Sequence, residues 1–234
     1  MHKPFIVFLS IFLISISISC SGQKKIIIQR DSDFIGKQSE IPVFDEIIAT
    51  QNGMGRAFLP QWLIMYLEGG ILEIESSEIF RDKYIFIGRN WGTNLSIITR
   101  WAENYNVYHD FPRLAAARIE NRLITAANLY PDDEYGDYFE ALVKKAFNTE
   151  YTGALKDETF WIKTRTHQEA DPDEPDQIVE PLELYEYFIL ISIDKKLLQT
   201  QIQKLMAEIN IINIPTRNQR AAVSRVEQIF FVGF

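Results

Sequence analysis

The run from Tyr185 to Ile193 constrains the fold of this chain more than any other segment. Its middle is apolar at odd and even positions alike, and successive side chains of a strand point to opposite faces of a sheet. We therefore expect a strand at the centre of a sheet. Two further strands are expected at 84–88, an apolar run closed by glycine, and at 160–165, where the residues alternate with a period of two.

The segment from Glu169 to Asp176, between the last two of these strands, is acidic and contains prolines. Such a composition disfavours both helix and strand, so we expect an exposed loop that joins two antiparallel strands. Its carboxylates could also bind Ca²⁺, because hard oxygen ligands gather there, but Pro172 and Pro175 interrupt the spacing of an EF-hand. A solvated acidic loop is the interpretation that we favour.

Several other segments have apolar residues at helical spacing and are predicted to be helices. The first is expected to span one or two turns, from Pro60 to the glycines at 69–70. Pro112 is expected to separate two later helices, because proline inside a helix removes a hydrogen bond. These later helices are predicted over 95–105, 113–129, 133–147 and 194–210, with Asp194 as the cap of the last one.

The order of strands and helices predicts an α+β fold, with a mainly antiparallel sheet and helices packed on one face. The last segment, from Pro215 to Phe234, has apolar residues first at helical and then at strand spacing, so a switch is expected near Glu227. This segment should add an edge strand to the sheet or dock in a groove of another subunit. Phe230 and Phe234 are therefore candidate contacts of a partner or ligand.

Residues 1–19 have the pattern of a secretion signal. Their apolar stretch of about 15 residues is shorter than the roughly 20 residues that a membrane-spanning helix needs. Small and polar residues flank Cys20, the only cysteine, as in a lipobox, although Ser17 stands where leucine is usual. Because a lone cysteine cannot form an internal disulfide, we expect Cys20 to carry a lipid such as palmitate. Ordinary cleavage near Ser19 or Ser21 is the alternative.

These features divide the chain into a signal peptide over 1–19, a lipidated tether over 20–45, an α+β domain over 46–210 and a helix and strand extension over 211–234. The tether could hold a short edge strand at Ile26 to Ile28. Removal of the signal takes away Lys3 and changes the formal net charge from −8 to −9. Since phosphate binding needs clustered positive charge, nucleic acid is disfavoured as a partner.

Five short motifs follow the lipoprotein signal: Pro60–Trp62, Tyr84–Gly88, Ala115–Ile119, Thr159–Trp161 and Tyr187–Lys195. In order and spacing they resemble the LPP-twenty lipoprotein family, whose relatives include the amino-terminal domain of flagellar assembly protein T and the curli-secretion lipoproteins. The resemblance covers residues 60–210 and implies an α+β domain that assembles or stabilises surface structures of bacteria, without a family active site. The acidic loop and the residues after 210 depart from the family's pattern.

The sequence contains no motif that is typical of a catalytic or metal site. His109 and His167 lack a partner at ligand spacing, and no nucleophile elbow or phosphate-binding glycine loop is found. Glu73 and Glu75 could act as a general acid and base, but 32 acidic residues produce such pairs by chance. We therefore expect a protein that is not an enzyme and binds no cofactor or metal.

The aromatic residues allow two interpretations. They could line a ligand-binding cleft, or they could belong to the core, which we favour. Trp91, beside Gly92 in a predicted loop, is the expected exception and a candidate contact of a partner or ligand. The other aromatic residues in question are Trp62, Trp101, Trp161, Tyr84, Tyr187 and Phe188.

Three functions compete at this point. The first is a non-catalytic lipoprotein of the bacterial cell envelope, lipid-anchored at the outer membrane on its periplasmic face or surface. It would scaffold or regulate the assembly of a larger surface or periplasmic structure, with other envelope proteins as partners. The second is a carrier that binds a small apolar ligand or lipid between helices and sheet. The third is a hydrolase, against which the absence of a catalytic motif speaks.

Overall fold

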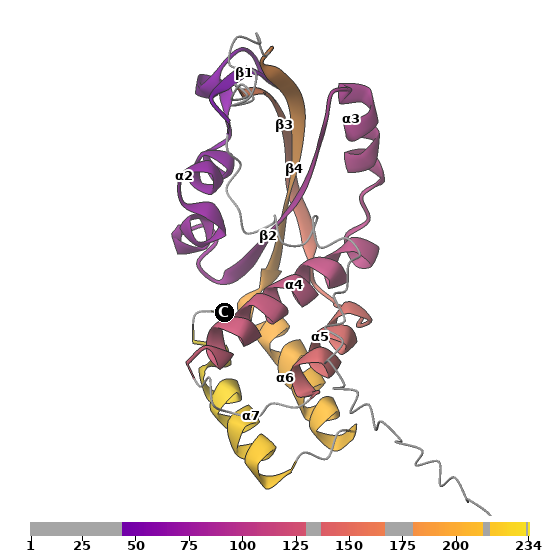
Figure 1. The fold of residues 1–234 in the computed structure, drawn as a ribbon. Coiled ribbons are helices and arrows are strands. Elements are labelled where there is room, and N and C mark those ends of the chain that lie inside the picture. Colours follow the sequence, from indigo (N-terminus) through magenta and orange to yellow (C-terminus); the bar gives the residue numbers. More distant parts are fainter. Residues whose placement is uncertain (1–43, 130–136, 167–179, 213–215, 233) are drawn as a thin grey trace, which may run out of the picture. The chain divides into compact units, whose positions relative to one another are not determined.

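The computed structural model describes residues 44–129, 137–166, 180–212, 216–232 and 234, without the side chains of 210–212 (Figure 1). Its strands form one antiparallel sheet in the order β1-β3-β4-β2, and helices pack on this sheet in a single domain. The predicted α+β fold with a mainly antiparallel sheet is thus confirmed. The strands are β1 (Glu46–Thr50), β2 (Lys83–Gly92), β3 (Leu155–Thr166) and β4 (Leu182–Asp194).

β4 lies inside the sheet, as its apolar sequence predicts. It pairs with β2 on one side and with β3 on the other, and both pairings are antiparallel. Ile189 and Leu190, which follow each other in β4 and face opposite sides, are fully buried. The expected antiparallel pairing of β3 and β4 is confirmed, while the acidic loop between them lies outside the described residues.

Helices cover both faces of the sheet, whereas the sequence suggested helices on one face only (Figure 1). α2 (Gln61–Ser76) packs on the face that carries Ile162 and Phe188. The physical reason is that a strand with two apolar faces needs packing elements on both faces of the sheet to shield its side chains from water. The helices on the opposite face are α3 (Leu95–Asn104), α4 (Val107–Ala127), α5 (Tyr138–Phe147), α6 (Lys195–Ile212) and α7 (Arg217–Phe230).

α2 continues past the glycine pair at which it was predicted to end. Gly70 has φ 73°, a left-handed conformation that glycine adopts without a steric penalty, and the helix is kinked there. The glycines therefore bend the helix instead of ending it. The part after the kink carries Ile74 and Glu75, both buried.

The break between α3 and α4 lies at Tyr105 and Asn106, upstream of the predicted position at Pro112. The Asn106 side chain accepts a hydrogen bond from the Tyr108 N–H at 3.0 Å, and Asp110 accepts one from the Asn106 N–H at 2.9 Å. These two bonds satisfy free donors at the helix start. Pro112 then lies inside α4, where it removes a single backbone hydrogen bond.

The C-terminal segment is helical to Phe230, so the predicted switch to a strand near Glu227 is wrong. α7 starts with a capping box of Thr216 and Gln219. Its apolar residues at helical spacing, including Val226 and Phe230, are buried on the core. Burial of that face favours continued helix over a strand at the sheet edge.

The Asp194 cap of α6 is confirmed, because its carboxylate accepts the N–H of Leu197 at 2.9 Å. Other predictions lie outside the described residues, and the structure does not bear on them. They are the signal peptide, Cys20, the tether strand at 26–28, the helix start at 133 and His167.

Candidate partner-binding surface

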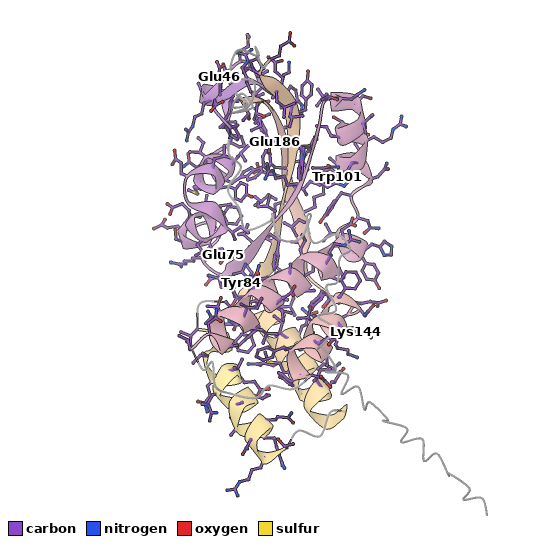
Figure 2. All side chains as sticks on the ribbon, in the orientation of Figure 1. Glu46, Glu75, Tyr84, Trp101, Lys144 and Glu186 are labelled. Carbon is purple, nitrogen blue, oxygen red and sulfur yellow. The ribbon has the colours of Figure 1, made fainter. Side chains whose placement is uncertain are left out.

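One end of the sheet gathers aromatic and charged side chains on both of its faces. We call it the hairpin end, because β3 stops there and β4 begins there. Cross-strand pairs define it in all four strands: Thr166 with Leu182, Trp91 with Glu186, and Glu46 with Arg165. Figure 2 labels Glu46 and Glu186 at this end.

On the face that α2 covers, Arg89, Trp91 and Glu186 form one cluster. The Arg89 guanidinium donates to the Glu186 carboxylate at 2.9 and 2.6 Å, and its central carbon lies 5.3 Å from the centre of the Trp91 ring. The Glu186 side chain is 6% exposed, whereas Trp91 is 36% exposed. A buried ion pair therefore holds a cation against an indole that is accessible from solvent.

Tyr66 of α2 lies near this ion pair. Burial raises the pKa of its phenol, Arg89 lowers that pKa and Glu186 raises it, with burial the strongest influence. The net direction is upward, so the phenol keeps its proton at neutral pH. Tyr66 is consequently unsuited to act as a base beside Trp91.

On the opposite face, Trp161 and Tyr185 meet edge to face with ring centres 5.8 Å apart. Lys163 lies 5.5 Å from the centre of the Tyr185 ring and donates to Glu183 at 2.5 Å. Arg165 donates to the same carboxylate at 2.8 Å and also pairs with Glu46. These hydrogen bonds lower the pKa of Glu183, which therefore stays ionised at neutral pH.

We call these two clusters together the hairpin-end surface. Tryptophan, tyrosine and arginine are the residue types that contribute most of the binding energy in protein interfaces. The acidic and basic side chains of the surface pair with one another, so a partner would meet aromatic rings among balanced charges. The surface consists of Glu46, Arg89, Trp91, Trp161, Lys163, Arg165, Glu183, Tyr185 and Glu186.

The tryptophans do not form one cleft, because the sheet separates them. Trp62 is buried on the α2 side, where its indole N–H donates to Glu158 at 2.7 Å. Trp101 and Trp161 pack on the other face. Tyr84, Tyr187 and Phe188 are core residues as well. Trp91 was expected in a loop but lies near the end of β2.

Phe230 and Phe234 are buried in the chain's own core instead of being exposed for a partner. Their ring centres lie 5.1 Å apart, and Phe234 also meets Tyr84 edge to face at 5.0 Å. Arg122 of α4 donates to the carbonyls of Ile229 and Phe230 at 2.7 Å and to that of Val232. A cation thus satisfies carbonyl groups at the end of α7, which also suits the helix dipole.

The proposed carboxylate pair of Glu73 and Glu75 is not brought together. Glu73 is exposed, whereas Glu75 is buried and forms a bidentate ion pair with Arg118 at 2.7 and 3.1 Å. The Arg118 guanidinium also lies 4.6 Å from the centre of the Tyr84 ring. Figure 2 labels Glu75 and Tyr84. Glu75 is therefore engaged in a structural contact, and Arg118 is a residue that the sequence analysis missed.

Among the residues that the structure describes, His, Cys, Asp and Glu do not gather into any group of three able to hold a metal ion. His109 is exposed on α4 beside the Tyr108 ring. In the same part of the chain, no helix has the length and apolar character required to cross a membrane.

The site and fold define an α+β domain with a sheet covered on both faces and an aromatic, charge-balanced surface at the hairpin end. No protein-family model, no curated protein and no solved structure matches this chain. The resemblance to the LPP-twenty family accordingly stays a prediction from short motifs.

Proposed function

We propose that this chain is a non-catalytic lipoprotein of the bacterial envelope, anchored through Cys20, which binds other envelope proteins through the hairpin-end surface. In this role it scaffolds or regulates a larger surface or periplasmic structure. The observation that carries the proposal is Trp91, which is 36% exposed while Arg89 and buried Glu186 hold it in place. A fixed indole loses little freedom on binding, so it can contribute fully to an interface.

The entry point of the chain supports the same surface. The N–H of Asp45 donates to the carbonyl of Arg165 at 3.0 Å, so the segment that leads from Cys20 joins the domain at the hairpin end. In a chain anchored at Cys20, the tether therefore reaches the folded domain first at the hairpin end.

The contacts of the charged residues support binding over catalysis. Glu75, Glu183 and Glu186 each pair with arginine or lysine. The pKa of Glu183 is lowered by its hydrogen bonds to Lys163 and Arg165, so this carboxylate stays ionised and is a poor general acid at neutral pH. The side chains at the surface are thus arranged for contact and fixed geometry.

Photo-crosslinking in intact cells tests the proposal. A photoreactive amino acid in place of Trp91 should trap envelope proteins, whereas the same group at Ile79 should not. Ile79 is a matched control because it is 80% exposed and lies before β2, away from the hairpin end.

Equal amounts of crosslinked envelope proteins at both positions would contradict the proposal. The absence of any crosslink at Trp91, with the protein present at its normal level, would contradict it as well. Lipid or fatty acid that co-purifies with the protein without being covalently attached to it would instead support the carrier function.

A further inference from the structure

We propose that Glu75 and Arg118 keep the edge of β2 closed to a second copy of this chain. β2 is an edge strand, since the sheet order is β1-β3-β4-β2. In an antiparallel ladder, alternate residues direct their backbone groups to the neighbouring strand and away from it. Ile85 lies opposite Ser192 of β4, but its N–H and carbonyl bond to side chains beyond the edge.

Two side chains from different helices bind these outward groups of Ile85. Glu75 of α2 accepts the Ile85 N–H at 2.7 Å, and Arg118 of α4 donates to the Ile85 carbonyl at 3.2 Å. The same two side chains are joined by their bidentate ion pair. Together they satisfy the donor and the acceptor that an additional strand would otherwise satisfy.

The neighbouring outward donors of β2 are also occupied. The N–H of Lys83 donates to the Phe80 carbonyl at 2.8 Å, and the N–H of Trp91 donates to the Asn90 side chain at 2.9 Å. Because the outward backbone groups of Ile85 are bound as well, at most those of Ile87 and Arg89 remain for pairing with another strand. This stretch is shorter than a typical strand, so the edge offers no full pairing site.

A second copy is the partner that this arrangement excludes. β2 is ten residues long, and its run from Tyr84 to Ile87 is apolar, without proline or charge. Edges of this kind pair with other strands unless charged side chains or covering elements prevent it. Two identical edges can pair antiparallel about a twofold axis, which makes another β2 the most available partner.

The decisive variant is the double substitution Glu75→Met and Arg118→Met. Apolar replacement of a whole buried ion pair is often tolerated, so the fold should persist while Ile85 loses both of its partners. The matched control is Arg89→Met with Glu186→Met. The two ion pairs have nearly equal side-chain exposure, 17% and 7% against 17% and 6%, but only the first one binds the β2 backbone.

The readout is native mass spectrometry of the full chain purified in a non-ionic detergent, combined with hydrogen exchange. We expect the Glu75 and Arg118 variant to shift from the monomer mass to multiples of it, with the Ile85 and Ile87 amides protected in the assembly. The control variant should keep the monomer mass. A folded Glu75 and Arg118 variant that stays monomeric, or that associates through another region or no more than the control, overturns the proposal.

If the double variant does not fold, Glu75→Asp decides. The shorter side chain keeps the negative charge near Arg118 but cannot hold the Ile85 N–H at the same time. Faster exchange of the Ile85 amide at a dilution where the protein is monomeric, together with self-association at higher concentration that protects this amide, supports the proposal. Faster exchange in a protein that stays monomeric overturns it, and so does an unchanged exchange rate.

Discussion

Phe230→Ala should destabilise the protein strongly, because α7 is part of the core. The Phe230 side chain is completely buried, and its ring lies 5.0 Å from that of Phe231 and 5.1 Å from that of Phe234. Truncation of a buried phenylalanine costs about 3–5 kcal/mol through lost burial and the cavity that is left. That loss is a large part of the roughly 5–15 kcal/mol that stabilises a typical domain. We expect the melting temperature to fall by about 6–20 °C.

Urea unfolding followed by circular dichroism and tryptophan fluorescence measures this loss. Phe147→Ala is the matched control, because Phe147 also ends a helix but is 44% exposed. It should change the free energy of unfolding by less than about 1 kcal/mol. If Phe230→Ala costs no more than the control, α7 does not belong to the folded core and the reasoning is refuted.

Two further predictions concern single polar groups. The buried Tyr151 hydroxyl has no hydrogen-bond partner among the described residues, so Tyr151→Phe should leave the free energy of unfolding unchanged or raise it by about 1 kcal/mol. Tyr138→Phe loses a 2.9 Å hydrogen bond to Glu227 and should lower that free energy by about 1–2 kcal/mol in the same urea titration. The hydrogen bonds from Lys163 and Arg165 lower the pKa of Glu183 from 4.5, so their contribution is present above pH 4.5 and is lost as the pH falls through the lowered value. The melting temperatures of Glu183→Gln and of the unmodified protein should therefore differ most above pH 4.5 and converge in acid. A difference that does not depend on pH would show that the ionisation of this carboxylate is not coupled to folding.

The sheet could be predicted from local sequence because strand burial leaves a short-range pattern. The double-sided apolar run of β4 and the period of two in β3 indicated their positions and their antiparallel pairing correctly. Helices were predicted on one face of the sheet only, although a strand that is apolar on both sides has to be covered on both. The helical stripe of α2 does not show which side of the sheet it will occupy. Choice of face depends on chain connections that local periodicity does not encode.

Helix ends were predicted only in part, since the glycine pair at 69–70 kinks α2 without ending it. Asp194 caps α6 as expected, but at α4 the proline signal competed with Asn106 and Asp110, whose reciprocal hydrogen bonds start the helix earlier. The C-terminal segment carried two overlapping patterns, and packing of Val226 and Phe230 on the core favoured the helix.

The candidate surface could be predicted only in part. Trp91 was singled out as a candidate contact and is 36% exposed, although it lies in β2 and not in the predicted loop. The ion pair beside it joins Arg89 to Glu186, which are 97 residues apart in the sequence. Glu75 and Arg118 are likewise separated by 43 residues. Such ion pairs leave no local spacing to recognise, since they arise from strand register and helix packing.

The most direct test of the central claim, a lipid-anchored envelope protein, is metabolic labelling with radioactive palmitate. Cells that express the full chain or its Cys20→Ala variant are labelled, and the protein is isolated and examined by electrophoresis. We predict that the full chain carries the label and that the variant carries none and accumulates as a slower-migrating precursor. Equal labelling of both proteins, or no label on the full chain, would contradict the account.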